Sequence, residues 1–522
     1  MRLLRNTMVE TGARKWIITL TVILAALLEL IDTTIVNVSI PQIMGNLGAT
    51  LDEVGWVVTS YTVANVIILP MSGWIGQKFG RKQYFLFSII LFVVASFFCG
   101  HAHTLSELIF FRIIQGLAGG GLLSPAQAIL IEIWPPAEIG MAMALFGLGA
   151  VAGPTVGPTI GGFITDHFSW PWIFYVNIPV GAFAVFMATT FIRDTPPSSK
   201  GEKIDWWGIV FLAVAVGSLQ LVLEKGESED WFHTTYIVVL AAAAFIFLIS
   251  FIWRELNIEY PVVNFHIMRH RSFTLGMFTS FMLGFAMYVS VFVFPVFCQN
   301  ILGFSALQTG ELLFPGGLAT ICMMPFVGSM LKRGVPAQIM STIGMIGFFI
   351  FSYMMASSNV FSGTENFFWP LIVRGIGMSL LFVPLTTLAM QDLKGKELGQ
   401  GTGLNNMMRQ LGGSFGIAIS TVFLNSRIAQ HRNMLVEHIS NYNDAFTQKY
   451  NAFYNGFLSK GFSVTQAKAM AFQAIDGSMM KQVLLLSYND VYLFVGIFLL
   501  FCIPLLYLQK FKKKVNIPTD MH

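Results

Sequence analysis

Apolar runs of about 20 residues, the length of a helix that crosses the hydrocarbon core of a membrane, alternate with short polar segments along most of this chain. The pattern predicts an all-α integral membrane protein with fourteen transmembrane helices. Their expected ranges are 16–39, 54–77, 83–103, 107–131, 140–165, 172–193, 205–224, 232–254, 273–299, 306–331, 337–357, 366–390, 398–424 and 485–509.

Lysine and arginine are distributed unevenly between the two sides of the predicted bundle. They gather in the N-terminal segment and in loops on the same side, at 78–82, 193–203, 254–271, 332–333, 394–396 and 510–514. The loop at 135–140 on this side has neither residue. Because basic loops stay in the cytoplasm, we expect a multi-pass protein of the inner (plasma) membrane with both termini cytoplasmic.

The long segment 427–484 is polar and lies on the outer side of the predicted bundle. Helix-like stretches near 428–440, 442–459 and 464–482 predict a hairpin of two or three amphipathic helices. This hairpin either docks a partner protein or is an inert, solvated insert.

The chain also contains a short internal similarity. The segment FFRIIQGLAGGG contains Arg112, and LIVRGIGMSL contains Arg374. Duplicated helical bundles are common in transporters. We therefore expect a six-helix bundle at 1–200, two inserted transmembrane helices at 201–260, and a second six-helix bundle at 261–522 that includes the outer hairpin.

Composition supports a membrane protein and excludes several other classes. The 522 residues are 55% hydrophobic and 11% charged, with a mean hydropathy of +0.68. The four cysteines have no disulfide or metal spacing, and no G-x-x-x-x-G-K-[ST] phosphate loop is present. A net charge of +4 does not indicate a nucleic-acid partner. We expect a transporter rather than an enzyme, with no metal or other cofactor.

A glycine stripe marks the predicted helix 140–165. In GAVAGPTVGPTIGG, a glycine recurs at every fourth position, so these residues share one helix face. Small residues allow a second helix to approach closely in lipid, and proline bends a helix. We expect a packing element and hinge formed by Gly149, Gly153, Pro154, Gly157, Pro158, Gly161 and Gly162.

Charged residues inside membrane spans are costly and are therefore candidates for function. Asp32 lies roughly 25 Å along its helix from Lys15, and Arg112 lies roughly 9 Å inside the outer end of its own helix, so contact between them is feasible. A carboxylate that pairs with arginine and releases it on protonation couples a proton to a conformational change. The alternative is a static ion pair. Glu29, one turn deeper, either shares the proton role or lines a wet cavity.

Other intramembrane polar residues are weaker candidates. Glu132 lies near the cytoplasmic end of its helix, where its carboxylate can reach water. Glu311 is expected to pair with Arg374, since both lie near the outer start of their helices. Glu132 and Glu311 are therefore candidates for proton transfer. Residues that we expect to line a substrate cavity are Thr33, Thr34, Asn37, Gln115, Arg374, Asn405 and Arg409.

Several motifs resemble the major facilitator superfamily, in particular its fourteen-helix drug:proton antiporters of the EmrB/QacA type. The similar segments are LIDTTIVNVSIP, GWIGQKFGRK, RIIQGLAGG, the glycine stripe with the WPWIFYVNIPVG that follows it, and FVPLTTLAM. The resemblance implies a loop motif with Gly73, Gly80 and Arg81. It also implies that Arg112 takes part in proton transfer. Gln77 stands where the loop motif usually has an acid, which weakens the expected charge contact between the two halves.

The resemblance further implies proton-driven export of hydrophobic, often cationic, drugs across a lipid membrane. EmrB-like exporters work with a periplasmic membrane-fusion adaptor and an outer-membrane channel. Two other interpretations stay open: a dedicated exporter of one metabolite, lipid or siderophore-like compound, and an assembly component whose hairpin mainly docks an adaptor.

Overall fold

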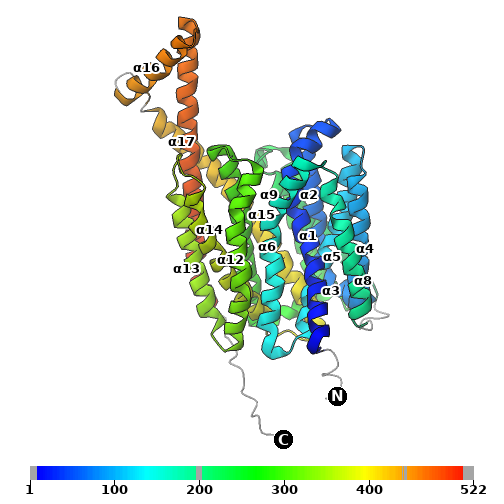
Figure 1. Cartoon of the computed structure of the whole chain (residues 1–522). Coiled ribbons are helices and arrows are strands. Elements are labelled where there is room, and N and C mark those ends of the chain that lie inside the picture. Colours follow the sequence, from blue (N-terminus) through cyan, green and yellow to red (C-terminus); the bar gives the residue numbers. More distant parts are fainter. Residues whose placement is uncertain (1–8, 195–202, 438, 440–443, 509–522) are drawn as a thin grey trace.

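The computed structural model describes residues 9–194, 203–437, 439 and 444–508, and this part of the chain is helical throughout, with no strand (Figure 1). The basic residues expected before residue 9, at Lys200 and at 510–514 lie outside the described residues. The first group of helices is α1 (Gly12–Leu47), α2 (Leu51–Ile68), α3 (Ser72–Phe79), α4 (Arg81–Gly100), α5 (Leu105–Ile133), α6 (Ile139–His167), α7 (Trp172–Tyr175) and α8 (Asn177–Phe191). We call these the N-terminal group.

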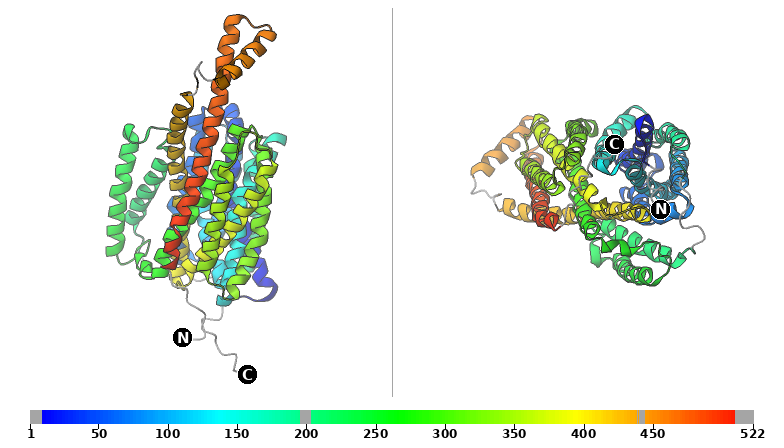
Figure 2. Two further views of the ribbon diagram at one scale, coloured as in Figure 1. Left: turned by 90° about the vertical axis from the view of Figure 1, so that its left-hand side faces the viewer. Right: turned by 90° about the horizontal axis from the view of Figure 1, so that it is seen from below.

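The remaining helices form an inserted pair and a second group. The inserted pair is α9 (Trp206–Lys225) and α10 (Thr235–Asn257). The C-terminal group is α11 (Arg271–Phe297), α12 (Ala306–Lys332), α13 (Ala337–Ala356), α14 (Glu365–Met390), α15 (Lys396–Val436), α16 (Asp444–Ser459), α17 (Val464–Phe501) and α18 (Ile503–Tyr507). We call the end of the bundle where α1 begins the inner end, and the end from which α16 projects the outer end (Figures 1 and 2).

The number of spans agrees with the expected fourteen. Twelve described helical segments are long and apolar enough to cross a membrane, and α2 with α3 forms a further span bent by 58°. The bend lies at Pro70, whose ring lacks an amide donor, between the end of α2 and the start of α3. The fourteenth span is α15, whose polar side chains lower its hydropathy although they are buried within the bundle.

The outer hairpin is simpler than predicted. Only α16 is a separate helix, because α15 continues unbroken beyond the bundle and α17 runs from Val464 into the membrane without interruption (Figure 1). A capping box at Ser463 and Gln466 starts α17. The Tyr450 ring lies 4.9 Å from the Phe472 ring and joins α16 to α17.

The inserted pair lies against both groups through α9. Gln220 donates a hydrogen bond to the Ser414 hydroxyl of α15 at 2.7 Å, and the Lys225 ammonium lies 5.3 Å from the Trp56 ring of α2. In contrast, α10 exposes most of its apolar surface. The pair therefore borders on lipid on one side and contacts α2 and α15 on the other.

The glycine stripe brings α6 close to α1. A Cβ atom built on Gly153 would lie 2.9 Å from Leu30 Cβ, and one on Gly161 would lie 2.8 Å from the Ile35 carbonyl oxygen. At Gly157 the nearest atom is the Thr34 hydroxyl oxygen. Although Pro154 and Pro158 lie within it, α6 is a continuous helix. The stripe therefore packs two helices against each other.

We expect Gly161→Ala to lower the thermal midpoint of the purified protein by several degrees, because α1 must shift away from the new methyl group at a cost of about 1–3 kcal/mol. Gly149→Ala is the matched control, since its Cβ would meet Leu27 at an ordinary 3.5 Å. Thermal unfolding followed by tryptophan fluorescence measures both. Equal midpoints for the two variants would contradict close packing at Gly161.

Candidate functional site

Asp32 and Arg112 form an ion pair inside the N-terminal group. Arg112 Nη1 of α5 donates to Asp32 Oδ2 of α1 at 2.5 Å, and both side chains are fully buried. The contact expected from their depths in the sequence is therefore present. A buried pair that loses one charge leaves the other uncompensated, at a cost of about 3–5 kcal/mol. Protonation of Asp32 is thus a large local perturbation.

Two further side chains hold the second carboxylate oxygen of Asp32, and a third side chain, Ser96, accepts hydrogen bonds from both of them. Gln115 Nε2 donates to Asp32 Oδ1 at 2.9 Å, and Asn177 Nδ2 of α8 donates to the same oxygen at 3.0 Å. Both amides also contact the Ser96 hydroxyl of α4, at 2.7 and 3.3 Å. We expected Gln115 to line a cavity, but the structure places it in this cluster because it lies one turn from Arg112 on the same face of α5.

Sequence reasoning did not assign Ser96 and Asn177 to this site. The signal for Asn177 was a single amide within the apolar segment WPWIFYVNIPVG. Ser96 gives no comparable signal, because serine is common in membrane helices and forms hydrogen bonds within them.

Arg112 is oriented by α2 as well as by Asp32. Its Nε donates to the Val57 carbonyl oxygen at 3.1 Å, and its guanidinium lies 4.1 Å from the centre of the Tyr61 ring. A Cβ built on Gly119 would lie 2.7 Å from the Tyr61 hydroxyl and 3.2 Å from Glu29 Cγ, so the hydroxyl end of this ring lies on the Glu29 side of the cluster. A displacement of Arg112 would therefore disturb α2.

Glu29 faces the C-terminal group across the bundle. Asn65 Nδ2 of α2 donates to Glu29 Oε1 at 3.0 Å, whereas Oε2 has no hydrogen-bond partner among the described residues. Glu29 interacts electrostatically with Arg409 of α15, and both side chains are buried. Glu29 is therefore a buried carboxylate that interacts with side chains of both groups.

The other α1 positions expected to line a cavity differ in their surroundings. The Thr34 hydroxyl faces Gly157 of α6, so this residue belongs to the helix contact instead. Thr33 is partly exposed and donates to the Leu30 carbonyl oxygen at 2.8 Å. Asn37 is exposed.

The expected pair of Glu311 and Arg374 does not form within the described chain. Glu311 is exposed in a groove of about 480 Å³ at the outer ends of α12 and α14, together with Glu365, Phe368 and Trp369. Arg374 is buried, 5% exposed, and no described residue forms an ion pair or hydrogen bond with it. Depth alone suggested this pair, but Glu311 faces the exposed groove whereas Arg374 is buried and does not line it.

Helix contacts also revise the register of the internal repeat. Gly116 of α5 approaches the Tyr61 carbonyl of α2 in the same way that Gly375 of α14 approaches the Gly316 carbonyl of α12. Counting back one residue from each glycine aligns Arg374 with Gln115, whereas Arg112 aligns with an apolar leucine at 371. The C-terminal group therefore has no arginine at the position of Arg112.

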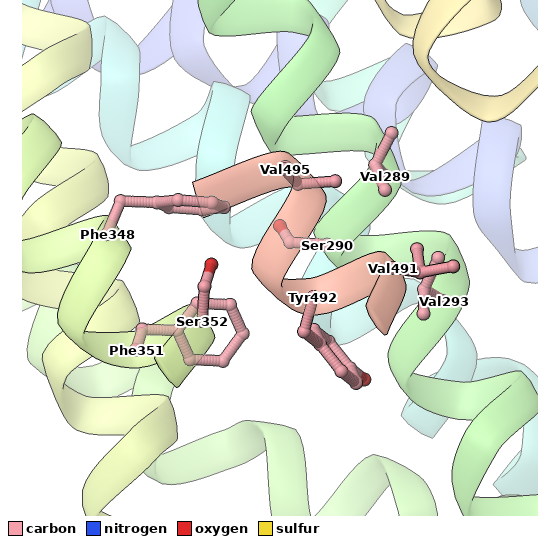
Figure 3. Close-up of a pocket in the computed structure, with 9 residues that line it drawn as sticks. All are labelled: Val289, Ser290, Val293, Phe348, Phe351, Ser352, Val491, Tyr492 and Val495. Atoms are coloured by element: carbon pink, nitrogen blue, oxygen red, sulfur yellow. The ribbon is translucent and has the colours of Figure 1, made fainter. Parts of the chain in front are cut away.

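Figure 3 shows a small cavity in the interior of the C-terminal group. At about 10 Å³ it has room for no more than about one water molecule. Its lining comes from α11, α13 and α17: Val289, Ser290, Val293, Phe348, Phe351, Ser352, Val491, Tyr492 and Val495. A space of this size cannot accept a drug-sized ligand and is a packing void.

The loop motif joins the two groups at the inner end. Gln77 Nε2 donates to the Lys396 carbonyl oxygen at 2.7 Å, so the neutral amide that replaces the usual acid still bridges the groups. Gly80 links α3 to α4 at a φ of 95°, which favours glycine. Arg81 forms an ion pair with Glu132 of α5.

Two further contacts close the inner end. A Cβ on Gly73 would lie 2.4 Å from the Gln400 backbone nitrogen, so α3 and α15 touch backbone to backbone. Glu138 accepts hydrogen bonds from Lys15 at 3.1 Å and Lys332 at 2.8 Å, which belong to different groups. We call the contacts of Gly73, Gln77, Glu138, Lys332 and Lys396 the inner gate.

Comparison with known families shows which family has this arrangement of helices. Residues 22–417 match the family model of the Major Facilitator Superfamily. The chain belongs to the major facilitator superfamily. It is therefore a multi-pass membrane protein of a transporter family.

Relatives within this superfamily match nearly the whole chain. Multidrug export protein EmrB of Haemophilus influenzae is 35% identical over 89% of this chain and 90% of its own length. EmrB of Escherichia coli K12 is 31% identical over 94% of each chain. Fatty acid resistance protein FarB of Neisseria gonorrhoeae is 30% identical over 96% of each chain.

Solved structures share the fold. The human organic anion transporter MFSD10 superposes with a TM-score of 0.56 at 12% identity, covering 94% of this chain and all of that one. A bacterial homologue of the lysosomal transporter Spinster gives a TM-score of 0.52 at 14% identity, covering 97% of this chain and all of that one.

Proposed function

We propose that this protein is a proton-coupled multidrug efflux antiporter that exports hydrophobic compounds by alternating access. The observation that carries the proposal is the fully buried pair of Asp32 and Arg112, in a chain similar to two multidrug export proteins over about nine tenths of its length. The proton gradient supplies the energy, and no cofactor takes part.

In the proposed cycle, Asp32 accepts a proton from the outer side and releases Arg112. The guanidinium then loses its carboxylate partner but keeps its contacts with Val57 and the Tyr61 ring on α2. Because α2 continues through the bend into α3, a shift of α2 reaches the inner gate. Opening of the inner gate admits the next ligand and lets the proton leave to the inside.

The two moving units of this cycle are residues 1–200 and 261–522, with 201–260 as the inserted pair. The close contact of α1 with α6 along the glycine stripe lies within the first unit and keeps these two helices together as that unit moves. Both ends of the chain are cytoplasmic, in the plasma or inner membrane. The α16–α17 hairpin then lies outside, where it is placed to meet a periplasmic adaptor that connects to an outer-membrane channel.

Transport in proteoliposomes tests the proposal. With an imposed proton gradient, the purified protein should accumulate several chemically unrelated hydrophobic ligands, and these should compete with one another. Accumulation of a single ligand class without competition would favour a dedicated exporter. Accumulation that ignores the proton gradient would overturn the antiport mechanism.

We expect Glu132→Gln to leave transport proton-driven while lowering its rate about two- to fivefold. Glu132 contacts Arg81 beside the inner gate and lies outside the Asp32 cluster, so its loss weakens a partly exposed ion pair worth about 1 kcal/mol or less. The ratio of ligand uptake with and without a proton gradient measures coupling. Loss of that ratio in Glu132→Gln would show that Glu132 carries protons.

A further inference from the structure

The polar face of α15 carries two buried hydrogen-bond donors that have no acceptor among the described residues. These are Asn405 Nδ2 and Arg409 Nη1, and both side chains are at least 97% buried. Residues four apart share a helix face, so the two donors lie one turn from each other. Buried polar groups are normally paired, and two adjacent unpaired donors indicate a place for an acceptor.

The surrounding residues fix the direction of these donors. Ser280 of α11 donates to Asn405 Oδ1 at 2.6 Å, so the amide oxygen is occupied and the NH₂ group is left free. The Arg409 guanidinium lies 5.3 Å from the centre of the Phe382 ring on α14. The polar donors of α15 therefore lie next to the apolar ring of Phe382.

The nearest protein carboxylate does not satisfy the two donors. Glu29 of α1 interacts electrostatically with Arg409, but its Oε2 is unpaired in the described chain and its Oε1 is bound by Asn65. A ligand carboxylate offers two acceptor oxygens on one carbon, which matches an arginine and an amide donor side by side.

The Arg409 donor lies on the side of α15 that faces the N-terminal group, where it interacts with Glu29 of α1. Asn406, the neighbour of Asn405, donates to Ser124 Oγ at 3.3 Å and Gln127 Oε1 at 3.2 Å, both on α5 of the N-terminal group. Separation of α15 from α5 would therefore expose this face of α15 to the inside, the side from which an exporter takes its ligand.

We propose that Asn405 and Arg409 form an anion subsite that binds the carboxylate of amphipathic ligands, while Phe382 contacts their apolar part. This inference rests on the proposed function, because it assigns a ligand chemistry to the exporter's own pathway. It makes organic carboxylates ligands of this protein in addition to the hydrophobic cations implied by its sequence motifs.

Binding of pyrenebutyrate and of its neutral methyl ester to the purified protein, measured by fluorescence anisotropy, tests the subsite. The wild type should bind the carboxylate about tenfold or more tightly than the ester, since a hydrogen bond to a charged group contributes that much. Arg409→Gln should remove the preference, Asn405→Ala should reduce it severalfold, and neither should change ester binding. Arg432→Gln is the matched control, because Arg432 is an exposed arginine on the same helix.

Equal wild-type affinities for the two probes, or an equal loss of both in Arg409→Gln, would overturn the subsite. If Arg409→Gln does not fold, Arg409→Lys tests it instead, because it keeps the charge but not the planar fork and should weaken carboxylate binding alone. Proton-driven uptake of ethidium by the wild type separates this inference from the proposed function. Uptake of ethidium without a carboxylate preference rejects only the subsite, whereas absence of any proton-driven uptake rejects the antiporter itself.

Discussion

Asp32→Asn should reduce proton-driven ligand accumulation in proteoliposomes about a hundredfold while leaving exchange of ligand across the membrane without a gradient within about threefold of wild type. The amide has nearly the shape of the carboxylate and can still accept a hydrogen bond from Arg112, but it cannot take up and release a proton. Parallel measurements of gradient-driven uptake and of counterflow separate coupling from binding.

Asp52→Asn is the control for this result, because Asp52 is an exposed carboxylate at the start of α2. It should behave as the wild type in both assays. Loss of Arg112's counter-charge also destabilises the fold, so thermal unfolding of Asp32→Asn must be measured alongside. A folded Asp32→Asn protein that concentrates ligand as well as the wild type would exclude Asp32 as the coupling residue.

Gly73→Ala should hold the inner end open and lower transport about tenfold or more. Its new methyl group would lie 2.4 Å from the backbone of Gln400, which no side-chain rotation can relieve. Labelling of Ser124→Cys, buried between α5 and α15, by a maleimide in inside-out vesicles measures the opening once the exposed Cys322 has been replaced by serine. The labelling rate should rise severalfold in Gly73→Ala.

Gly399→Ala provides the matched comparison on the facing helix. A Cβ there would meet its nearest neighbours, Arg81 and Gly73, at an ordinary 3.6 Å. It should leave both labelling and transport near wild-type values. If Gly73→Ala and Gly399→Ala were labelled at the same rate, backbone contact at Gly73 would not be what closes the inner gate.

Hydropathy predicted most of the membrane architecture because burial in lipid demands long apolar helices whatever their tertiary contacts. It missed the bend between α2 and α3, because Pro70 lies in an otherwise apolar run and the hydropathy of a segment does not report the direction of the helix axis. It located the helical stretches of the hairpin but not their continuity with the membrane helices, because α15 and α17 stay helical where the composition changes from apolar to polar.

Pairs in the candidate site could be predicted only where two side chains lie at the same depth in the membrane and also point toward each other. Asp32 and Arg112 lie at compatible depths and also face each other. Glu311 and Arg374 lie at comparable depths, but each residue along a helix turns the side chain by about 100°. Two side chains at the same depth therefore point in different directions when one of them is shifted by a single residue along its helix. The Asp32 partners Ser96 and Asn177 needed the packing of α4 and α8, which no local pattern contains.

The unbroken path of α17 has a mechanical consequence. Its 38 residues form a rod about 57 Å long, rooted among α11 and α13 and ending in the hairpin outside. A tilt of about 10° at its root displaces the far end by about 10 Å over that length. A small rotation of α17 inside the membrane therefore produces a large displacement of the hairpin tip, which the distance between a pair of spectroscopic labels can measure.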